Sequence, residues 1–253
     1  MKLYNIVFSP TGGTQTVAAL LADTLDGEVT SVDLTDSKQN FRMVQLTQED
    51  VAVISVPSYG GRVPAVAVKR LTMLNGQGAR AILVCVYGNR AYEDTLVELE
   101  DAAKQAGFRV IAAVAAVAEH SIVRQFAAGR PDAQDVKQLS DFARQIQAKL
   151  SAGDCSEPAI PGNRPYKKAG GTSMVPKPTK ECTKCGVCAA ECPVQAIDKE
   201  NPKKVDEKAC ISCMRCVSVC PHSARKVNPV MLSAASLMLK KVCSERKDCQ
   251  LFL

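Results

Sequence analysis

The sequence of 253 residues contains no tryptophan, two histidines and only 4% aromatic residues. Aromatic side chains are especially scarce after residue 150, so nucleic-acid bases would find few platforms on which to stack, and no nucleic-acid partner is expected. The first residues, Met1–Phe8, lack the apolar core and the cleavage site of a signal peptide. The apolar run at Val230–Val242 is too short to cross a bilayer. We therefore expect a cytoplasmic protein without membrane insertion.

The sequence also lacks the common nucleotide-binding motifs. No lysine follows the glycines of the segment Ser9–Thr14 (SPTGGT), which excludes G-x-x-x-x-G-K-[ST], and G-x-G-x-x-G is absent too. This segment nevertheless lies directly between an expected strand and an expected helix. Its glycines and hydroxyl residues let N–H and O–H groups converge on an anion at the positive end of the helix dipole. We predict a phosphate-binding loop, and the alternative is a turn of small capping residues.

Cysteine, by contrast, is abundant, and eight of the twelve cysteines form two runs. Both runs read C-x-x-C-x-x-C-x-x-x-C-P, at Cys182–Pro193 and at Cys210–Pro221. Three thiolates two residues apart on one tight loop can bind three irons of a cubane, and the fourth iron needs a ligand from elsewhere. Zinc sites separate their cysteine pairs by a longer stretch, and a disulfide framework needs an oxidising compartment. The runs therefore predict two [4Fe-4S] clusters.

Residues 180–228 resemble the bacterial ferredoxin family that carries two [4Fe-4S] clusters. The resemblance implies a small α+β ferredoxin-like domain in which the fourth cysteine of each run crosses to the other cluster. An internal repeat supports it, because Cys182–Ile197 and Cys210–Arg225 align at a period of 28 residues. The implied ligand sets are Cys182, Cys185, Cys188 and Cys220 for one cluster, and Cys210, Cys213, Cys216 and Cys192 for the other.

The remaining cysteines and the two histidines carry weaker signals. Cys85 lies in an apolar stretch and is expected in the core. His120 could donate a proton near a substrate and His222 could tune a cluster through a hydrogen bond, but a structural role is commoner for both. No set of catalytic residues stands out. A third metal site would need one more ligand than the three other cysteines supply, which are Cys155, Cys243 and Cys249.

Residues 1–150 alternate apolar strands with amphipathic helices. This alternation predicts a doubly wound α/β domain, with a five-stranded parallel sheet, right-handed crossovers and ligands at the carboxyl ends of the strands. The expected strands are 3–8, 29–34, 51–56, 81–86 and 108–117. The expected helices are 14–25, 64–74, 92–106 and 131–150.

The segment Ser9–Thr14 resembles the flavodoxin family, whose phosphate loop reads [ST]-x-[ST]-G-x-T. The resemblance implies the strand order 2-1-3-4-5 and bound FMN, with phosphate contacts from Ser9, Thr11, Gly12, Gly13 and Thr14. Two further loops would hold the ring, through Pro57, Ser58, Tyr59, Gly60 and Gly61 after the third strand and through Tyr87, Gly88, Asn89 and Tyr92 after the fourth. Tyr59 and Tyr92 are the expected stacking residues, with Tyr87 next. Backbone groups of Gly60 and Gly88 would approach the ring nitrogens.

Composition divides the chain into four segments. We expect a flavodoxin-like FMN-binding domain at 1–150, a linker rich in Pro, Gly and Lys at 151–180, the ferredoxin domain at 181–228 and a helical extension at 229–253. This order is similar to the flavodoxin-ferredoxin fusion proteins of anaerobes, as is the segment Pro161–Tyr166 (PGNRPY). The resemblance implies a linker that packs along the flavodoxin-like domain.

Charge is distributed unevenly between the two halves. Residues 1–150 carry 15 basic and 16 acidic side chains, and residues 151–253 carry 17 and 10. Two clusters of charge about −2 each would offset much of this excess. The positive charge that remains belongs either to an ordinary solvated face or to a docking face for an acidic redox partner.

These features predict an electron-transfer iron-sulfur flavoprotein that relays electrons between its clusters and FMN, to or from a redox partner. The alternatives are an FMN-dependent reductase of a small acceptor and a redox or oxygen sensor. The sequence leaves the direction of electron flow and the oligomeric state open.

Overall fold

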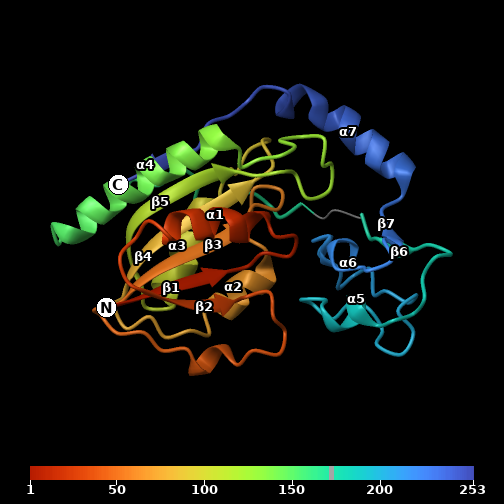
Figure 1. Cartoon of the computed structure of the whole chain (residues 1–253), viewed down its shortest axis with the longest axis horizontal. Helices are drawn as coiled ribbons and strands as arrows, with labels where there is room; N and C mark the ends of the chain where they lie inside the picture. The colour runs from red at the N-terminus through yellow and green to blue at the C-terminus, as the bar shows by residue number, and fades with distance from the viewer. Residues whose placement is uncertain (171–173) are drawn as a thin grey trace.

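The computed structural model describes residues 1–170 and 174–253, so residues 171–173 of the expected linker lie outside the described part. The chain forms a large α/β domain and a small cysteine-rich domain, connected by the linker and by a long helix (Figure 1). The strands of the large domain are β1 (Lys2–Val7), β2 (Glu28–Asp33), β3 (Val51–Pro57), β4 (Arg80–Tyr87), β5 (Arg109–Val117) and β8 (Gln250–Phe252). Its helices are α1 (Gly13–Ala22), η1 (Phe41–Met43, a 3-10 turn), α2 (Ala65–Leu71), α3 (Thr95–Gln105) and α4 (Ala133–Ser151).

The sheet has the strand order β2-β1-β3-β4-β5-β8. Strands β1 to β5 are parallel and confirm the predicted order 2-1-3-4-5. Strand β8 is antiparallel to β5, with Gln250 opposite Ala115 and Phe252 opposite Ala113. This sixth strand is not predictable from the sequence, because three residues are too few to show an alternating pattern.

The sheet is buried between two layers of helices. Successive residues of a strand point to opposite faces, so Ala52 and Ile54 pack with α2 and α3, whereas Val51 and Val53 pack with α1 and α4. All four side chains are at most 1% exposed. Burial on both faces explains the continuous apolar run of β3, as is typical of parallel sheets. Cys85, in β4, is fully buried in this core, as expected.

The cysteine-rich domain consists of two similar halves. Its elements are β6 (Lys177–Pro178), α5 (Val187–Ala190), α6 (Arg215–Ser218) and β7 (Arg225–Lys226), and β6 pairs antiparallel with β7. The backbone repeats at the predicted period. Gly186 and Met214, which are 28 residues apart and precede the two helices, have positive φ angles of 81° and 63°. Lys184 and Ser212, again 28 residues apart, also have positive φ.

Helix α7 (Pro229–Cys243) confirms the helix expected after the cysteine runs. Asn228 caps its start by accepting a hydrogen bond from the Val230 N–H (2.9 Å). From the small domain α7 reaches back to the large domain, where its apolar residues pack on Phe126 in the loop after β5 (Figure 1). The chain then continues into β8. Among the described residues, no helix combines the length and apolarity needed to span a membrane.

Candidate cofactor sites

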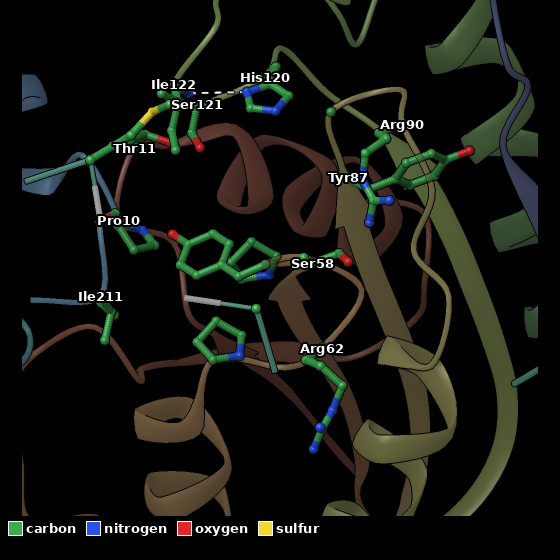
Figure 2. A pocket seen from close by; sticks show the side chains of 18 of the residues that line it. Pro10, Thr11, Ser58, Arg62, Tyr87, Arg90, His120, Ser121, Ile122 and Ile211 are labelled. Carbon is green, nitrogen blue, oxygen red and sulfur yellow. Dashed lines mark hydrogen bonds between the residues drawn. The ribbon is translucent and has the colours of Figure 1, made fainter. Parts of the chain in front are cut away.

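A cavity of about 850 Å³ opens at the carboxyl ends of β1, β3, β4 and β5. Doubly wound sheets bind ligands at this edge, and with the strand order 2-1-3-4-5 the binding point lies between β1 and β3. The cavity is lined by loops of the large domain, by the linker, by α7 and by the small domain. Figure 2 shows lining residues of the large domain together with Ile211 of the small domain. The walls of the cavity therefore come from both domains.

The loop between β1 and α1 presents N–H groups and hydroxyls to this cavity. Gly12 has a φ angle of 96°, a left-handed conformation that favours glycine, and α1 begins at the next residue. The Ser9 hydroxyl accepts a hydrogen bond from the Gln15 N–H (2.9 Å) and so holds the loop in shape. Thr11 and Thr14 line the cavity, and neither hydroxyl has a hydrogen-bond partner among the described residues. This donor set fits a bound phosphate group.

The loop after β3 forms a second wall. The Ser58 hydroxyl shares a hydrogen bond with that of Thr95 (2.7 Å), and Tyr59 and Arg62 exchange backbone hydrogen bonds across a tight turn. Burial raises the pKa of the Tyr59 phenol well above its usual value, and the nearby Cys213 adds to this shift. Tyr59 therefore lines the cavity as a neutral side chain.

The loop after β4 contributes less to the cavity than predicted. Tyr87 and Gly88 line it, but the Tyr87 side chain is directed away from the centre of the cavity in Figure 2. Asn89 instead donates two hydrogen bonds, both 2.8 Å, to carbonyl oxygens at the end of α7 and just after it. Tyr92 donates to the Gln250 side chain of β8 (2.5 Å). Asn89 and Tyr92 thus hold the C-terminal segment and are not among the described residues that line the cavity, so the cofactor contacts predicted for them stay a prediction.

The other predicted FMN residues also fall into two groups, those that line the cavity and those that do not. Gly61 does not line the cavity but packs against Glu93, where a Cβ atom would lie only 1.8 Å from the carboxylate oxygen. Ser9 and Gly12 shape the phosphate loop from outside the lining. Nine predicted residues line the cavity: Thr11, Gly13, Thr14, Pro57, Ser58, Tyr59, Gly60, Tyr87 and Gly88.

The loop after β5 forms a wall to which the sequence analysis assigned only a minor role for His120. His120 accepts hydrogen bonds at Nδ1 from the N–H groups of Ile122 (3.2 Å) and Val123 (3.1 Å) (Figure 2). Burial lowers the pKa of His120, so the ring is neutral near pH 7 and carries its proton on Nε2. Gly88 is required here, because a Cβ atom would lie 2.7 Å from the His120 side chain.

Two small cavities in the cysteine-rich domain match the two predicted ligand sets. Cys192, Cys210, Cys213 and Cys216 line one, which we call the inner cluster site. Cys182, Cys185, Cys188 and Cys220 line the other, the outer cluster site. The fourth cysteine of each run thus crosses to the other site.

The backbone around the crossing cysteines fits clusters as well. The Ala196 N–H donates to the Cys192 sulfur and the Ala224 N–H to the Cys220 sulfur, both at 3.3 Å, so the two sites repeat the same hydrogen bond. Within the described ranges, no three ligating side chains are close enough to hold a single metal ion. A cubane needs a wider set, because each thiolate binds a different iron.

The inner cluster site adjoins the large cavity. Cys210, Ile211 and Ser212 line that cavity, and Ile211 lies at its edge in Figure 2. No cysteine of the outer cluster site is among the described residues that line it. The sequence could not reveal this proximity, because it depends on how the two domains pack.

Two arginines connect the domains beside the inner cluster site. Arg70 of α2 donates from Nη2 to the carbonyl oxygen of Pro193 (2.6 Å) and from Nη1 to that of Leu34 (2.7 Å). Arg215 of α6 donates from Nη1 to the carbonyl oxygen of Pro10 in the phosphate loop (3.4 Å). These contacts hold the inner cluster site against the α/β domain.

Comparisons with known proteins agree with the cluster sites. The profile of the 4Fe-4S dicluster domain matches residues 170–225. Ferredoxin-2 of Chlorobaculum tepidum is 40% identical over 55 residues, which cover 19% of this chain and 89% of that ferredoxin. One subunit of the tetrathionate reductase of Archaeoglobus fulgidus is 35% identical over 83 residues, 32% of this chain, and the match spans only 38% of that polypeptide.

Among solved structures, a flavodoxin of Streptococcus pneumoniae is similar to this chain, with 21% identity and a TM-score of 0.42. The match covers 58% of this chain and 99% of that flavodoxin. An archaeal flavodoxin covers 60% of this chain and 99% of its own, with 12% identity and a TM-score of 0.44. The fold assignment rests on the strand order, which is flavodoxin-like. The cysteine-rich domain belongs to the family of ferredoxins with two [4Fe-4S] clusters, and the chain joins it to a domain with the flavodoxin-like strand order.

Proposed function

We propose that this protein relays electrons between its two [4Fe-4S] clusters and an FMN in the large cavity, to or from a redox partner. One observation carries the proposal: Cys210 of the inner cluster site and the phosphate-binding loop line the same cavity. When bound, the clusters supply one-electron transfer and the flavin supplies two-electron chemistry, so the pair connects the two kinds of carrier.

In this proposal, the chain's own residues bind the phosphate of FMN and cover its ring. Thr11, Thr14 and the N-terminus of α1 hold the phosphate, because their free donors face the cavity at the positive end of the helix dipole. Tyr59 and Pro57 supply apolar surface for the ring. His120 presents its Nε2–H at the opposite wall as a fixed hydrogen-bond donor.

The outer cluster site is the contact point for the partner in this proposal. Its Cys185 is exposed, whereas Cys213 of the inner cluster site is only 8% exposed. Lys180 and Lys184 are exposed on the same loop. An acidic partner would be attracted to this basic edge. We place the exchange in the cytoplasm, where reducing conditions keep the cysteines available as ligands.

Anaerobic purification with assays of iron, sulfide and FMN tests the relay. We expect about eight irons per chain, as two cubanes require, together with one FMN. During stepwise reduction, electrons added at the clusters should appear on the flavin in the visible spectrum. A chain that holds both clusters but takes up no FMN after incubation with it would overturn the relay and leave a ferredoxin attached to a flavodoxin-like domain.

A reductase of a small acceptor is the second candidate. It is favoured by the extent of the cavity, whose lining goes beyond the phosphate and ring loops to the linker, the loop after β5 and α7. Such walls, with His120 among them, could hold an acceptor against the ring. Anaerobic mixing of pre-reduced protein with quinones or nitroaromatic compounds separates the two functions. The reductase passes its stored electrons to them rapidly without a partner protein, whereas the relay does so slowly.

A further inference from the structure

Arg225 occupies an unusual position between the two cluster sites. Its side chain is only 2% exposed and is the largest fully buried side chain among the described residues. It lines both the inner and the outer cluster site. It is the only arginine to do so in the described part of the chain.

The protein leaves the charge of this guanidinium without a counter-ion. Nη1 donates to the carbonyl oxygen of Pro176 (3.1 Å) and Nη2 to that of Pro202. Nε is buried and has no hydrogen-bond partner among the described residues. Within the same residues, no carboxylate forms an ion pair with Arg225. Burial of an unpaired charge is strongly unfavourable, so compensating negative charge is needed close by.

The internal repeat shows that the fold itself does not need arginine here. The residue 28 positions earlier is Ile197, which is buried (5% exposed) in the equivalent place of the first half. The two halves otherwise repeat both the backbone and the N–H to sulfur hydrogen bonds. A buried arginine therefore takes the place of a buried apolar residue, and it lines both cluster sites.

We propose that Arg225 is a counter-charge shared by the two clusters, which raises the reduction potential of each. Each oxidised cluster carries a charge of about −2 with its four thiolates, and one more electron makes it more negative. A positive charge in a buried, low-dielectric position stabilises this reduced form. The free Nε–H is available to donate to a cluster sulfur. The inference rests on the cluster sites alone, so it stands or falls independently of FMN binding.

Redox titration of the full chain, followed by EPR, tests this role. Arg225→Met removes the charge and keeps much of the side-chain volume, and Arg225→Lys keeps the charge but loses the planar donors. Lys226→Met is the matched control, because it removes an exposed charge at the next position. In Arg225→Met we expect the reduced-to-oxidised ratio of both clusters at a fixed potential to fall about tenfold, a shift of about 59 mV for one electron. Arg225→Lys and Lys226→Met should retain most of the wild-type potential.

The alternative is that Arg225 only holds the Pro176 and Pro202 carbonyls in place. Arg225→Met and Arg225→Lys would then lower the stability of the protein, and the reduction potentials of the assembled clusters would stay at the wild-type values. That result would overturn the proposal. If Arg225→Met fails to assemble its clusters, pulsed EPR of reduced protein with ¹⁵N-labelled arginine decides. The measurement uses an Arg215→Lys background, because Arg215 is the other arginine that lines the inner cluster site. In this background, ¹⁵N coupling to the reduced clusters supports the proposal, and its absence contradicts it.

Discussion

At the scale of single residues, Thr14 is the clearest candidate for a phosphate ligand in the large cavity. It is buried (5% exposed), it lines the cavity, and its hydroxyl has no partner among the described residues. Thr16 lies two residues further along the same helix, where it is exposed and its hydroxyl donates to the Gly12 carbonyl oxygen (3.3 Å). The two threonines therefore form a matched pair of similar helix propensity but different surroundings.

We predict that Thr14→Val weakens FMN binding and that Thr16→Val does not. A hydrogen bond to a charged group contributes about 1.5–3 kcal/mol, which corresponds to a loss of affinity of about 10- to 100-fold. Titration of the quenching of FMN fluorescence measures the dissociation constant. Iron content should stay at the wild-type level in both variants. Equal affinities for Thr14→Val and wild type would show that the phosphate does not contact this hydroxyl.

Residue motifs predict chemistry better than they predict partners. The cysteine spacing, together with the resemblance to ferredoxins, predicted which cysteines share each small cavity, because the covalent chemistry of a cubane fixes the spacing within each run. Asn89 and Tyr92 were assigned to FMN from their place in a loop, yet they bind segments about 150 residues away in the sequence. Local sequence carries no information on such partners. Arg225 did leave a signal, since it stands where the first repeat has Ile197.

At the scale of elements, the linker is docked against α3, as the resemblance to fusion proteins implied. Asp94 directly precedes α3 and is 2% exposed. It accepts hydrogen bonds from the N–H groups of Asn163 (2.9 Å) and Lys167 (2.7 Å). Arg164 adds ion pairs to Glu100 and Asp101 of α3. The linker therefore has a fixed path in this region despite its proline and glycine content.

We predict that Asp94→Asn releases the linker. The amide can accept at only one of the two positions, so either the Lys167 N–H or the Asn163 N–H loses its acceptor, at a cost of about 1–3 kcal/mol in the free energy of unfolding. Chemical denaturation measures this change, and limited proteolysis within 151–180 should become faster. Asp26→Asn, at an exposed carboxylate in the turn between α1 and β2, should change neither measurement. Unchanged proteolysis in Asp94→Asn would show that other contacts suffice.

The same carboxylate gives a pH dependence. The Lys167 and Asn163 hydrogen bonds lower the pKa of Asp94 from its ordinary value in unfolded chains, about 3.9. A lowered carboxyl pKa stabilises the fold above the unfolded value and loses this contribution as the pH falls through the folded value. The difference in unfolding free energy between wild type and Asp94→Asn should therefore be constant near neutral pH and shrink below about pH 4. A difference that stays constant down to about pH 2 would contradict this assignment.

Element prediction succeeded where burial imposes a long pattern and failed where it does not. The five parallel strands carry continuous apolar runs because both faces are buried, so their order of appearance was readable. Strand β8 has three residues and gains its place only by pairing with the edge of β5. Its position follows from α7, which brings the chain back to the sheet (Figure 1).

At the scale of the whole molecule, the ferredoxin domain is attached to the flavodoxin-like domain on both sides. The docked linker leads into it, and α7 and β8 lead out of it and return to the sheet (Figure 1). Arg70 and Arg215 add direct contacts near the inner cluster site. Interfaces of modest size between domains ordinarily permit relative motion. Attachment at both ends restricts that motion and keeps Cys210 at the wall of the cavity.

Arg70 provides the sharpest test of this arrangement, because it reaches from α2 to the residue that follows Cys192 of the inner cluster site. Arg70→Ala removes its hydrogen bonds to Pro193 and Leu34 and should weaken domain docking by about tenfold or more. We expect slower reduction of the flavin by pre-reduced clusters in stopped-flow measurements, with unchanged iron and FMN content. Lys69→Ala, at the exposed neighbouring position, is the control and should match wild type. If Arg70→Ala transfers electrons at the wild-type rate while amide hydrogen exchange shows that residues 194–196 are loosened, electron transfer does not depend on this contact.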